Sequence, residues 1–261
     1  MSIISIAIQK GGSGKTTTAI NLAAALQQQG KKVLLLDADP QASLSEALGI
    51  TEEPERNLFT ELSREMKGES SDLSQVIVET RSGLPVVPSS IELAGAELEL
   101  VSVYGREQVF SWMLEKLAGK YDFIFIDCPP AIGMLTVNAL VASDYILMPM
   151  QAEFLPLKGL RSFMHHFKIV KKLNKRLEML GYVLTRYDER RIMNRQIFHV
   201  LEQEFGDKVF QTHIRNNSQL AKAQEAGIDI FHFDKNSHGA RDYEALGKEF
   251  LIKIGGGGVI L

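Results

Sequence analysis

The chain has 261 residues, of which 45% are hydrophobic and 23% charged, and its formal net charge is only −3. That length can bury a complete core, which fits a single domain over residues 1–261, and no apolar stretch approaches the roughly 20 residues that a membrane span needs. The start of the chain lacks the features of a secretion signal, and the single cysteine, Cys128, excludes an intrachain disulfide, so a cytoplasmic location is expected.

Apolar runs of strand length alternate with helical patterns along the chain. The runs are short, continuous and rich in β-branched residues, as buried parallel strands are, and they cover residues 3–8, 33–36, 123–126, 145–148 and 182–184. Helical patterns cover residues 16–29, 107–117, 135–141, 156–173, 194–205 and 239–252, and the acidic residues 51–75 favour surface helices or loops. This order predicts an α/β fold: a doubly wound, mostly parallel twisted sheet with helices on both faces.

A glycine-rich loop joins the first predicted strand to the first predicted helix. Gly14, Lys15 and Thr16 fit the end of the pattern G-x-x-x-x-G-K-[ST], with Gln9 in place of its leading glycine. Such a loop points backbone N–H groups at phosphate oxygens, next to the positive end of a helix. Lys15 is expected to reach the β- and γ-phosphates and Thr16 to ligate Mg²⁺. The predicted ATP-binding residues of the loop are Lys10, Gly11, Gly12, Ser13, Gly14, Lys15, Thr16 and Thr17.

Carboxylates end two of the predicted strands. Asp127 ends an apolar strand, where an unpaired carboxylate would be costly, so we expect it to partner Mg²⁺. Asp37 and Asp39 end the strand over residues 33–36, and Pro40 restricts the turn that follows.

These motifs resemble those of the ParA/Soj/MinD ATPases. Residues 10–17 match the deviant Walker A signature K-G-G-x-G-K-T-T of that P-loop NTPase class, residues 34–42 resemble its switch I, and residues 123–130 resemble its Walker B and switch II. Residues 136–140, 149–153 and 205–210 follow in family order, so the resemblance covers nearly the whole chain.

The resemblance implies a catalytic set of Lys10, Lys15 and Asp39. Asp39 would orient or activate the attacking water, and Asp37 would lie near Mg²⁺ with Thr16 and Asp127. Lys10 would reach the phosphates held by the second subunit of an ATP-bound homodimer, which ties dimerisation to the γ-phosphate.

The family's adenine pocket is completed late in the chain, and residues 214–223 stand in the corresponding place. There the proline and both arginines of the family pattern are replaced, and Arg215 and Asn217 are the residues expected near the base.

A basic segment predicts a surface that faces a polyanion. Residues 158–195 hold 11 Lys and Arg against 3 Asp and Glu, whereas residues 41–107 hold 5 Lys and Arg against 13 Asp and Glu. A solvated helix face is the simpler alternative. The DNA-binding prediction comprises Lys168, Lys171, Lys172, Lys175, Arg176, Arg186, Arg190, Arg191, Arg195, Arg215 and Lys222.

The resemblance implies a slow ATPase whose ATP-bound dimer binds DNA without sequence preference and associates with the nucleoid. A ParB-like or other activating adaptor would then stimulate hydrolysis and release it, which moves a plasmid, a chromosome or another cargo. The chain starts at its first strand, so no N-terminal helix-turn-helix domain is expected.

Two alternatives share this fold. A MinD-like membrane-positioning ATPase needs a basic amphipathic C-terminal helix, but the glycine run at residues 255–258 breaks a helix, so no stable membrane association is expected. A metabolic P-loop enzyme, such as an amide-forming synthetase or an iron–sulfur reductase, is the other. The reductase needs a bridging cysteine pair, and only Cys128 is present.

Overall fold

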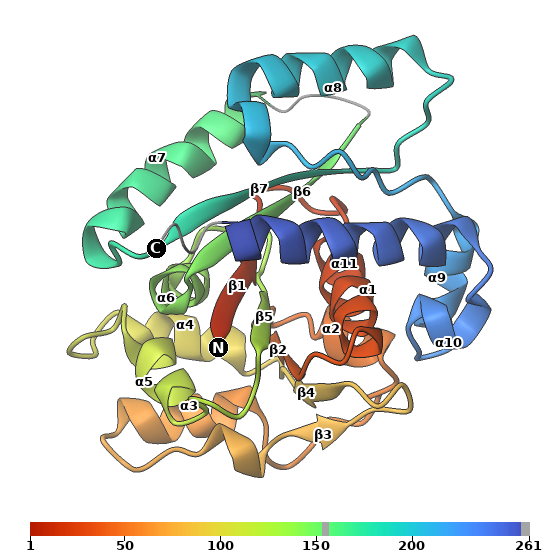
Figure 1. Cartoon of the computed structure of the whole chain (residues 1–261). Coiled ribbons are helices and arrows are strands. Elements are labelled where there is room, and N and C mark those ends of the chain that lie inside the picture. The colour runs from red at the N-terminus through yellow and green to blue at the C-terminus, as the bar shows by residue number, and fades with distance from the viewer. Residues whose placement is uncertain (153–156, 257–261) are drawn as a thin grey trace.

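The structure, a computed structural model, describes residues 1–152 and 157–256 (Figure 1). Residue 153 of the family stretch 149–153, the start of the helix predicted at residue 156, and the glycine and apolar tail from residue 257 onward lie outside the described residues.

The described residues form one seven-stranded sheet in the order β3-β4-β2-β5-β1-β6-β7. Neighbouring strands are parallel except for the antiparallel pair β3 and β4. The strands are β1 (Ser2–Ile6), β2 (Val33–Asp37), β3 (Val78–Glu79), β4 (Pro85–Val87), β5 (Phe123–Asp127), β6 (Tyr145–Gln151) and β7 (Glu178–Thr185).

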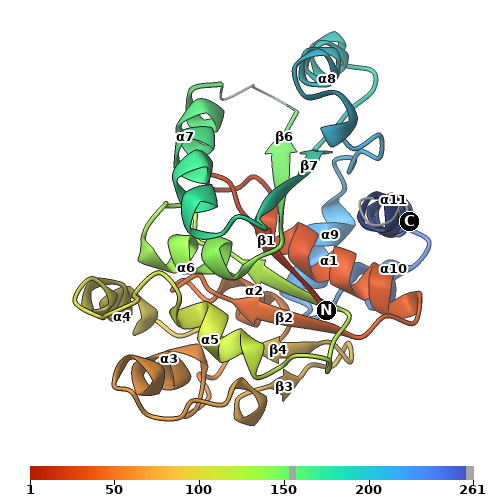
Figure 2. The ribbon, with the colours of Figure 1, turned by 60° about the vertical axis from the view of Figure 1, so that its left-hand side comes forward.

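Helices cover both faces of the sheet, as Figure 2 shows most clearly. One face carries α1 (Lys15–Gln28), α2 (Ser43–Ala47), α9 (Ser218–Glu225), α10 (Ile230–Asp234) and α11 (His238–Gly256). The other carries α3 (Leu58–Met66), α4 (Leu93–Leu100), α5 (Val109–Glu115), α6 (Met134–Ala142), α7 (Leu157–Leu173) and α8 (Ile192–Phe205). The predicted doubly wound, mostly parallel α/β fold is therefore confirmed.

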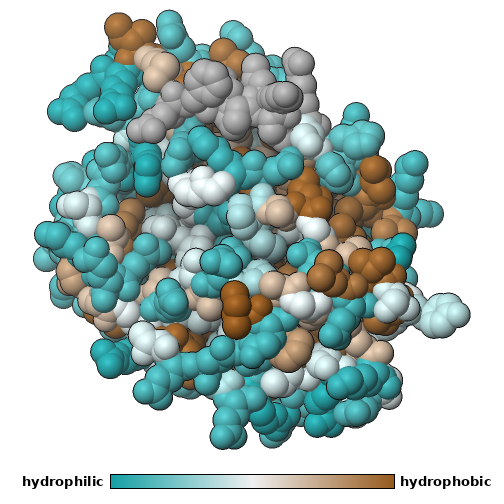
Figure 3. Space-filling view, turned by 180° about the vertical axis from the view of Figure 1, so that it is seen from behind, coloured by the Kyte–Doolittle hydropathy of each residue, from teal (hydrophilic) through white to brown (hydrophobic). Residues whose placement is uncertain are grey.

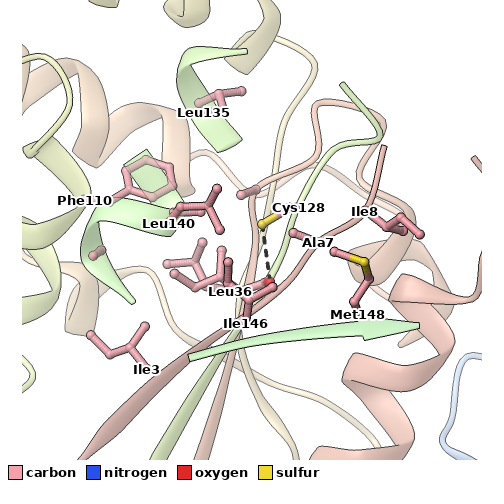
Figure 4. Packing of buried hydrophobic residues seen from close by; sticks show 14 of the residues in the cluster. Ile3, Ala7, Ile8, Leu36, Phe110, Cys128, Leu135, Leu140, Ile146 and Met148 are labelled. Carbon is pink, nitrogen blue, oxygen red and sulfur yellow. Dashed lines mark hydrogen bonds between the residues drawn. The ribbon is translucent and has the colours of Figure 1, made fainter. Parts of the chain in front are cut away.

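The central strands are buried on both faces, which explains why their sequences are apolar runs without alternation. In β1, Ile3 packs into the core under α3–α8, whereas Ile4 packs into the core under α1 and α11. Figure 4 shows the first of these cores around Cys128, whose thiol is buried and lies 3.7 Å from the carbonyl oxygen of Ile126. Burial raises the pKa of this thiol to about 12, so Cys128 is a packing residue.

The five predicted strands and the six predicted helices are present, with different ends. Strands β3 and β4 were not predicted, because they contain two and three residues and are too short for a periodic signal. The short helices α2, α4, α9 and α10 were not predicted either, while α3 lies in the segment expected to hold surface helices or loops. The helix predicted to end at residue 252 extends to Gly256, two residues into the glycine run.

The face shown in Figure 3 is mostly hydrophilic, with apolar side chains in several separate patches. None of the helices that the structure describes is both long and apolar enough to cross a membrane.

Candidate functional site

The loop between β1 and α1 turns with two glycines in the left-handed region. Gly12 has φ 70° and Gly14 has φ 90°, and Gly14 is the N-cap from which α1 starts. Other residues are strained at such angles, so these positions require glycine. The loop thus leads directly into the N-terminus of a 14-residue helix, where unpaired N–H groups favour an anion.

Side chains from β6 and β7 hold this loop in place. The Gln151 amide accepts a hydrogen bond from Lys10 Nζ at 3.2 Å and donates one to the carbonyl oxygen of Gly12. The Thr185 hydroxyl donates to the carbonyl oxygen of Ser13 at 2.9 Å. Neither Gln151 nor Thr185 was predicted from the sequence as a site residue. Gln151 ends β6, which pairs with β1, and Thr185 ends β7, which pairs with β6; their place at the ends of these parallel strands was the available signal.

Lys15 is the first residue of α1 and is 8% exposed. Its ammonium group lies 3.4 Å from the carbonyl oxygen of Lys10, so the side chain folds back across the loop. A cation held there by one long hydrogen bond is placed to contact a phosphate group bound on the loop.

Parallel pairing brings two predicted metal partners together. Asp37 ends β2 and Asp127 ends β5, and the register of the two strands sets these residues opposite each other. Thr16 donates its hydroxyl to Asp127 Oδ2 at 2.6 Å, while Asp127 Oδ1 is buried with no hydrogen-bond partner among the described residues. Asp37 Oδ2 accepts hydrogen bonds from the backbone N–H and the hydroxyl of Ser45 at 2.9 and 2.8 Å.

Both carboxyl groups resist ionisation. Burial raises the pKa of Asp37 to about 7, against the hydrogen bonds from Ser45. Burial and the negative charge of Asp37 raise the pKa of Asp127 to about 8, although Thr16 and Lys15 oppose the shift. Two buried carboxylates side by side repel each other, and a cation between them would relieve that repulsion.

The site therefore fits Mg²⁺. Thr16 supplies a hydroxyl, Asp127 supplies a buried oxygen without a partner, and Asp37 supplies a second negative charge opposite it. Hard oxygen ligands of this kind are those that Mg²⁺ prefers, with phosphate oxygens and water completing its shell.

Asp39 lies just beyond the end of β2 and is partly exposed. Its Oδ1 accepts a hydrogen bond from the backbone N–H of Gln41 at 3.0 Å, and its carbonyl oxygen accepts one from the Ser89 hydroxyl at 2.6 Å. Its Oδ2 has no hydrogen bond to the described residues, which leaves one carboxylate oxygen for water.

A cavity of about 490 Å³ opens beside the loop. The predicted residues Gly12, Ser13, Gly14, Lys15, Thr16, Thr17, Arg215 and Asn217 line it, whereas Lys10, Gly11, Asp37, Asp39 and Asp127 do not. The rest of its wall comes from α2, the end of β7, residues 214–218, α9 and Tyr243 of α11.

The two residues expected near the base are engaged by the protein itself. The Arg215 guanidinium forms an ion pair with Asp242 of α11, with the closest contact at 2.5 Å, and the backbone N–H of Arg215 donates to the same carboxylate. The Asn217 side chain accepts from the backbone N–H of Gln219 and caps α9. These contacts fix the shape of the cavity wall.

Nine of the eleven predicted DNA-binding residues form two groups at opposite ends of β7, whereas the exposed Arg215 is paired with Asp242 and the exposed Lys222 lies on α9. Lys168, Lys171, Lys172, Lys175 and Arg176 lie at the end of α7 and before β7, whereas Arg186, Arg190, Arg191 and Arg195 lie after it, toward α8. All nine are exposed. β7 has eight residues, so about 25 Å of strand separates the groups. Figure 1 shows α8 at the top and the α7–β7 loop at the left.

The chain is similar to known proteins over nearly its whole length. Residues 1–179 match the family model described as "AAA domain". The chain is 41% identical over 249 residues to the sporulation initiation inhibitor protein Soj of Bacillus subtilis, covering 95% of this chain and 97% of that protein. It is 38% identical over 256 residues to the chromosome partitioning protein ParA of Caulobacter vibrioides, covering 97% and 95%.

Solved structures have the same fold. One is described as cobyrinic acid a,c-diamide synthase from Mycobacterium smegmatis with bound ADP and magnesium; it has a TM-score of 0.84 and 31% identity, covering 99% of this chain and 97% of that chain. A putative plasmid partition protein from Borrelia burgdorferi bound to AMPPNP has a TM-score of 0.79 and 29% identity, covering 97% and 99%. On the strength of the phosphate loop, the paired carboxylates and relatives matched from end to end, the chain belongs to the ParA/Soj family of partition ATPases.

Proposed function

We propose that this partition ATPase is a switch driven by ATP and Mg²⁺, in which an ATP-bound sandwich dimer binds DNA and hydrolysis releases it. The observation that carries the proposal is the meeting of Thr16 with Asp127, opposite Asp37, at the N-terminus of α1. A magnesium–triphosphate site requires oxygen ligands beside the N-terminus of a helix. Here the ligands are one hydroxyl and two carboxylates, and the burial that raises the pKa values of both carboxylates would favour a bound cation.

In this proposal each residue of the chain has a defined task. The loop N–H groups and Lys15 hold the triphosphate, and Thr16, Asp37 and Asp127 hold the metal. When bound, Mg²⁺ offsets the negative charge of the β- and γ-phosphates. Asp39 orients or activates the attacking water with its free oxygen.

Lys10 is the residue proposed to join two subunits. Among the described residues its ammonium group is bound by one side-chain amide, that of Gln151 at 3.2 Å, and the residue is partly exposed. Exchanging that neutral partner for a phosphate of the second subunit would make a stronger, charge-assisted contact. Dimerisation would then depend on bound ATP.

Two lysine variants test this proposal. Lys15→Ala is expected to lose ATP binding in a titration with a fluorescent nucleotide. Lys10→Ala is expected to keep nucleotide binding but to remain a monomer in light scattering with a non-hydrolysable ATP analogue, and to hydrolyse ATP poorly. An ATP-dependent dimer of Lys10→Ala would refute the role of this lysine.

The proposal extends to DNA, location and partner. The two basic groups around β7 would bind DNA phosphates without reading sequence, and a dimer would double the number of contacts. The protein would be cytoplasmic and associated with the nucleoid, and a ParB-like or other adaptor would stimulate hydrolysis. The cargo would be a plasmid, a chromosome or another assembly.

The name of the Mycobacterium smegmatis structure supports one alternative, an ATP-dependent amide-forming enzyme on the same fold. The two functions are separated by what the purified protein requires. A partition ATPase should release ADP faster with DNA and an adaptor, whereas a synthetase should release ADP only with its small-molecule substrates.

A further inference from the structure

Two short helices, α2 and α9, contribute to the wall of the nucleotide cavity although they are far apart in the sequence. The lining residues that they supply are Ser43 and Ala47 from α2 and Ser218, Leu220, Ala221 and Gln224 from α9. If the phosphates of a nucleotide lie on the loop, the nucleoside is left with the rest of the wall, which includes α9.

Each of the two helices is also bonded to a neighbour of the phosphate or the metal. In α2, Ser45 donates its backbone N–H and its hydroxyl to Asp37 Oδ2, at 2.9 and 2.8 Å. In α9, Gln224 Nε2 donates to Thr17 Oγ1 of α1 at 3.2 Å. α2 therefore holds a carboxylate of the metal site, whereas α9 belongs to the wall that is available to the nucleoside.

The two helices end at glycine turns whose backbones touch. Gly49 follows α2 with φ 82°, and Gly227 follows α9 with φ 71°. A Cβ atom on Gly227 would lie 2.9 Å from the Cα atom of Gly49, and one on Gly49 would lie 3.2 Å from the carbonyl oxygen of Gly227. The atoms in the way belong to the backbone, so they cannot turn aside as a side chain can. Both the left-handed angles and the lack of space require glycine at these positions.

The turn at Gly49 is closed on the residue that binds Asp37. The backbone N–H groups of Leu48 and Ile50 both donate to the carbonyl oxygen of Ser45, at 3.2 and 3.0 Å. A displacement of Gly49 would therefore move Ser45 and the two hydrogen bonds that Ser45 donates to Asp37.

The turn at Gly227 is fixed independently of α2. Asp229 donates its N–H to Ser82 Oγ at 3.0 Å, and Ile230 donates its N–H to the side-chain oxygen of Asn21 in α1 at 2.9 Å. Because these bonds anchor the turn, a change in α9 cannot be absorbed by moving the turn away from α2. Close-packed backbone atoms transmit such a change to their neighbour.

The start of α2 shows that packing sets the position of this helix. Ala42 precedes the helix with φ 51°, in the left-handed region that alanine rarely adopts, and no side chain caps the helix there. Local preference alone would not hold this conformation. The position of α2 therefore depends on its tertiary contacts, and the contact with Gly227 is one of them.

We propose that Gly49 and Gly227 are positioning residues that couple the nucleoside part of the cavity to the metal site. A bound nucleoside sets α9, the glycine contact passes this to α2, and Ser45 then orients Asp37 for Mg²⁺. By linkage, Mg²⁺ strengthens nucleoside binding by the same factor. The inference rests on the proposed function, because it assumes that the cavity binds ATP with Mg²⁺.

Gly227→Ala tests the contact, because its methyl group would press on the backbone of Gly49. Gly68→Ala is the matched control. Gly68 also follows a helix, has φ 73°, and a Cβ atom there would meet nothing within 4 Å. Both variants therefore carry the same backbone strain, but only Gly227→Ala displaces α2. Gly49→Ala changes the same contact more mildly and takes the place of Gly227→Ala if that variant does not fold.

Calorimetric titration of the full chain with a non-hydrolysable ATP analogue, in EDTA and in excess Mg²⁺, gives the factor by which the metal strengthens binding. Gly227→Ala should reduce this factor about fivefold or more, the lower end of the usual coupling between sites, with little change of affinity in EDTA. A role limited to stability would weaken binding equally in both conditions. Gly68→Ala should keep the wild-type factor, and a wild-type factor in Gly227→Ala or in its substitute Gly49→Ala would overturn the inference alone. Wild-type binding that ignores Mg²⁺ would contradict the proposed function as well.

A second measurement needs no variant. Neither Ser45 nor Gly49 lines the nucleotide cavity, so their amide NMR signals report on α2 without direct contact with the ligand. In EDTA, ADP should shift both signals, whereas tripolyphosphate, which has no nucleoside, should shift the amide of Gly14 in the loop and leave them in place. Signals of Ser45 and Gly49 that ADP does not move, or that both ligands move equally, would overturn the inference.

Discussion

At the scale of single residues, the site depends on charges that the protein holds at a cost. Asp37 and Asp127 are fully buried and face each other at the ends of neighbouring strands. The positive charge of Lys15 lowers the pKa of Asp127 but does not offset the effect of burial. The stored repulsion favours binding of a cation, and this makes nucleotide and metal binding a source of stability for the folded chain.

The first prediction concerns how the free energy of unfolding depends on pH. The pKa values of about 7 and about 8 exceed the ordinary value of 3.8, so between pH 4 and pH 8 the folded state binds more protons than the unfolded state. The free energy of unfolding of the nucleotide-free protein should therefore fall as the pH rises through this window. Urea unfolding at several pH values measures it.

Asp127→Asn supplies the control, because the amide keeps the shape without the charge. Its stability should change less with pH than that of the wild type, and Mg²⁺ with ATP should flatten the dependence of the wild type. The same slope in variant and wild type would show that Asp127 is not the titrating group.

Asp39 allows binding and hydrolysis to be separated. Asp39→Ala loses one hydrogen bond to Gln41 and keeps the loop, so it should bind ATP and dimerise. Its turnover should fall by about 10²- to 10⁴-fold, the usual contribution of a positioned general base. Phosphate release under single-turnover conditions measures this step, and normal turnover would remove Asp39 from the mechanism.

At the scale of elements, α11 matters for the site although it comes last in the chain. Asp242 of this helix binds Arg215 in the cavity wall, and Tyr243 lines the cavity with its hydroxyl 3.3 Å from that of Thr18 in α1. Phe250 packs between the rings of Phe123 and Phe125 in β5, with centroids 5.4 and 5.6 Å away. The helix thus joins the nucleotide cavity to the centre of the sheet.

Substitution of Phe250 tests how much the contact between α11 and β5 stabilises the fold. Phe250 is fully buried, and Phe250→Ala should lower the free energy of unfolding by about 3–5 kcal/mol, the usual cost of removing a buried ring. Ile252→Ala is the matched control, because Ile252 lies on the same helix and is 72% exposed. Urea unfolding should show almost no effect of the control; equal effects would mean that α11 does not anchor through Phe250.

At the scale of the whole molecule, the predicted DNA-binding residues of the basic segment form one group before β7 and one after it. The group after β7 is partly neutralised, since Arg190 binds both oxygens of Asp188 and Arg191 lies 3.9 Å from the same carboxylate. Of the group at the end of α7, Lys168, Lys172 and Lys175 form no ion pair with the described residues. The α7 group is therefore better placed to release counterions on binding DNA.

The last prediction follows from that difference. Binding of the ATP-bound protein to unrelated duplexes should weaken steeply between about 50 and 200 mM salt. Lys168→Ala/Lys172→Ala/Lys175→Ala should reduce the salt slope by about one for each lysine that contacts a phosphate. Lys248→Ala, an exposed lysine paired with Glu244 on α11, is the control. A slope unchanged by the triple variant would show that α7 does not contact DNA.

The class of fold and the phosphate loop could be predicted from local sequence patterns. Buried parallel strands must be apolar throughout, and a tight turn before a helix must use glycines at positions such as Gly12 and Gly14, so these features are written in local patterns. The carboxylates at the ends of β2 and β5 could be predicted as well, because each directly follows or ends an apolar run of strand length.

The distant side chains that complete the site could not be predicted, because long-range packing brings them together. Gln151 and Thr185 hold the loop, Ser45 and Ser89 hold the aspartates, and Asp242 holds Arg215. These contacts join residues that lie between 8 and 172 positions apart. They depend on strand order and helix packing, which bring residues from distant parts of the chain together. Local sequence patterns do not record such contacts.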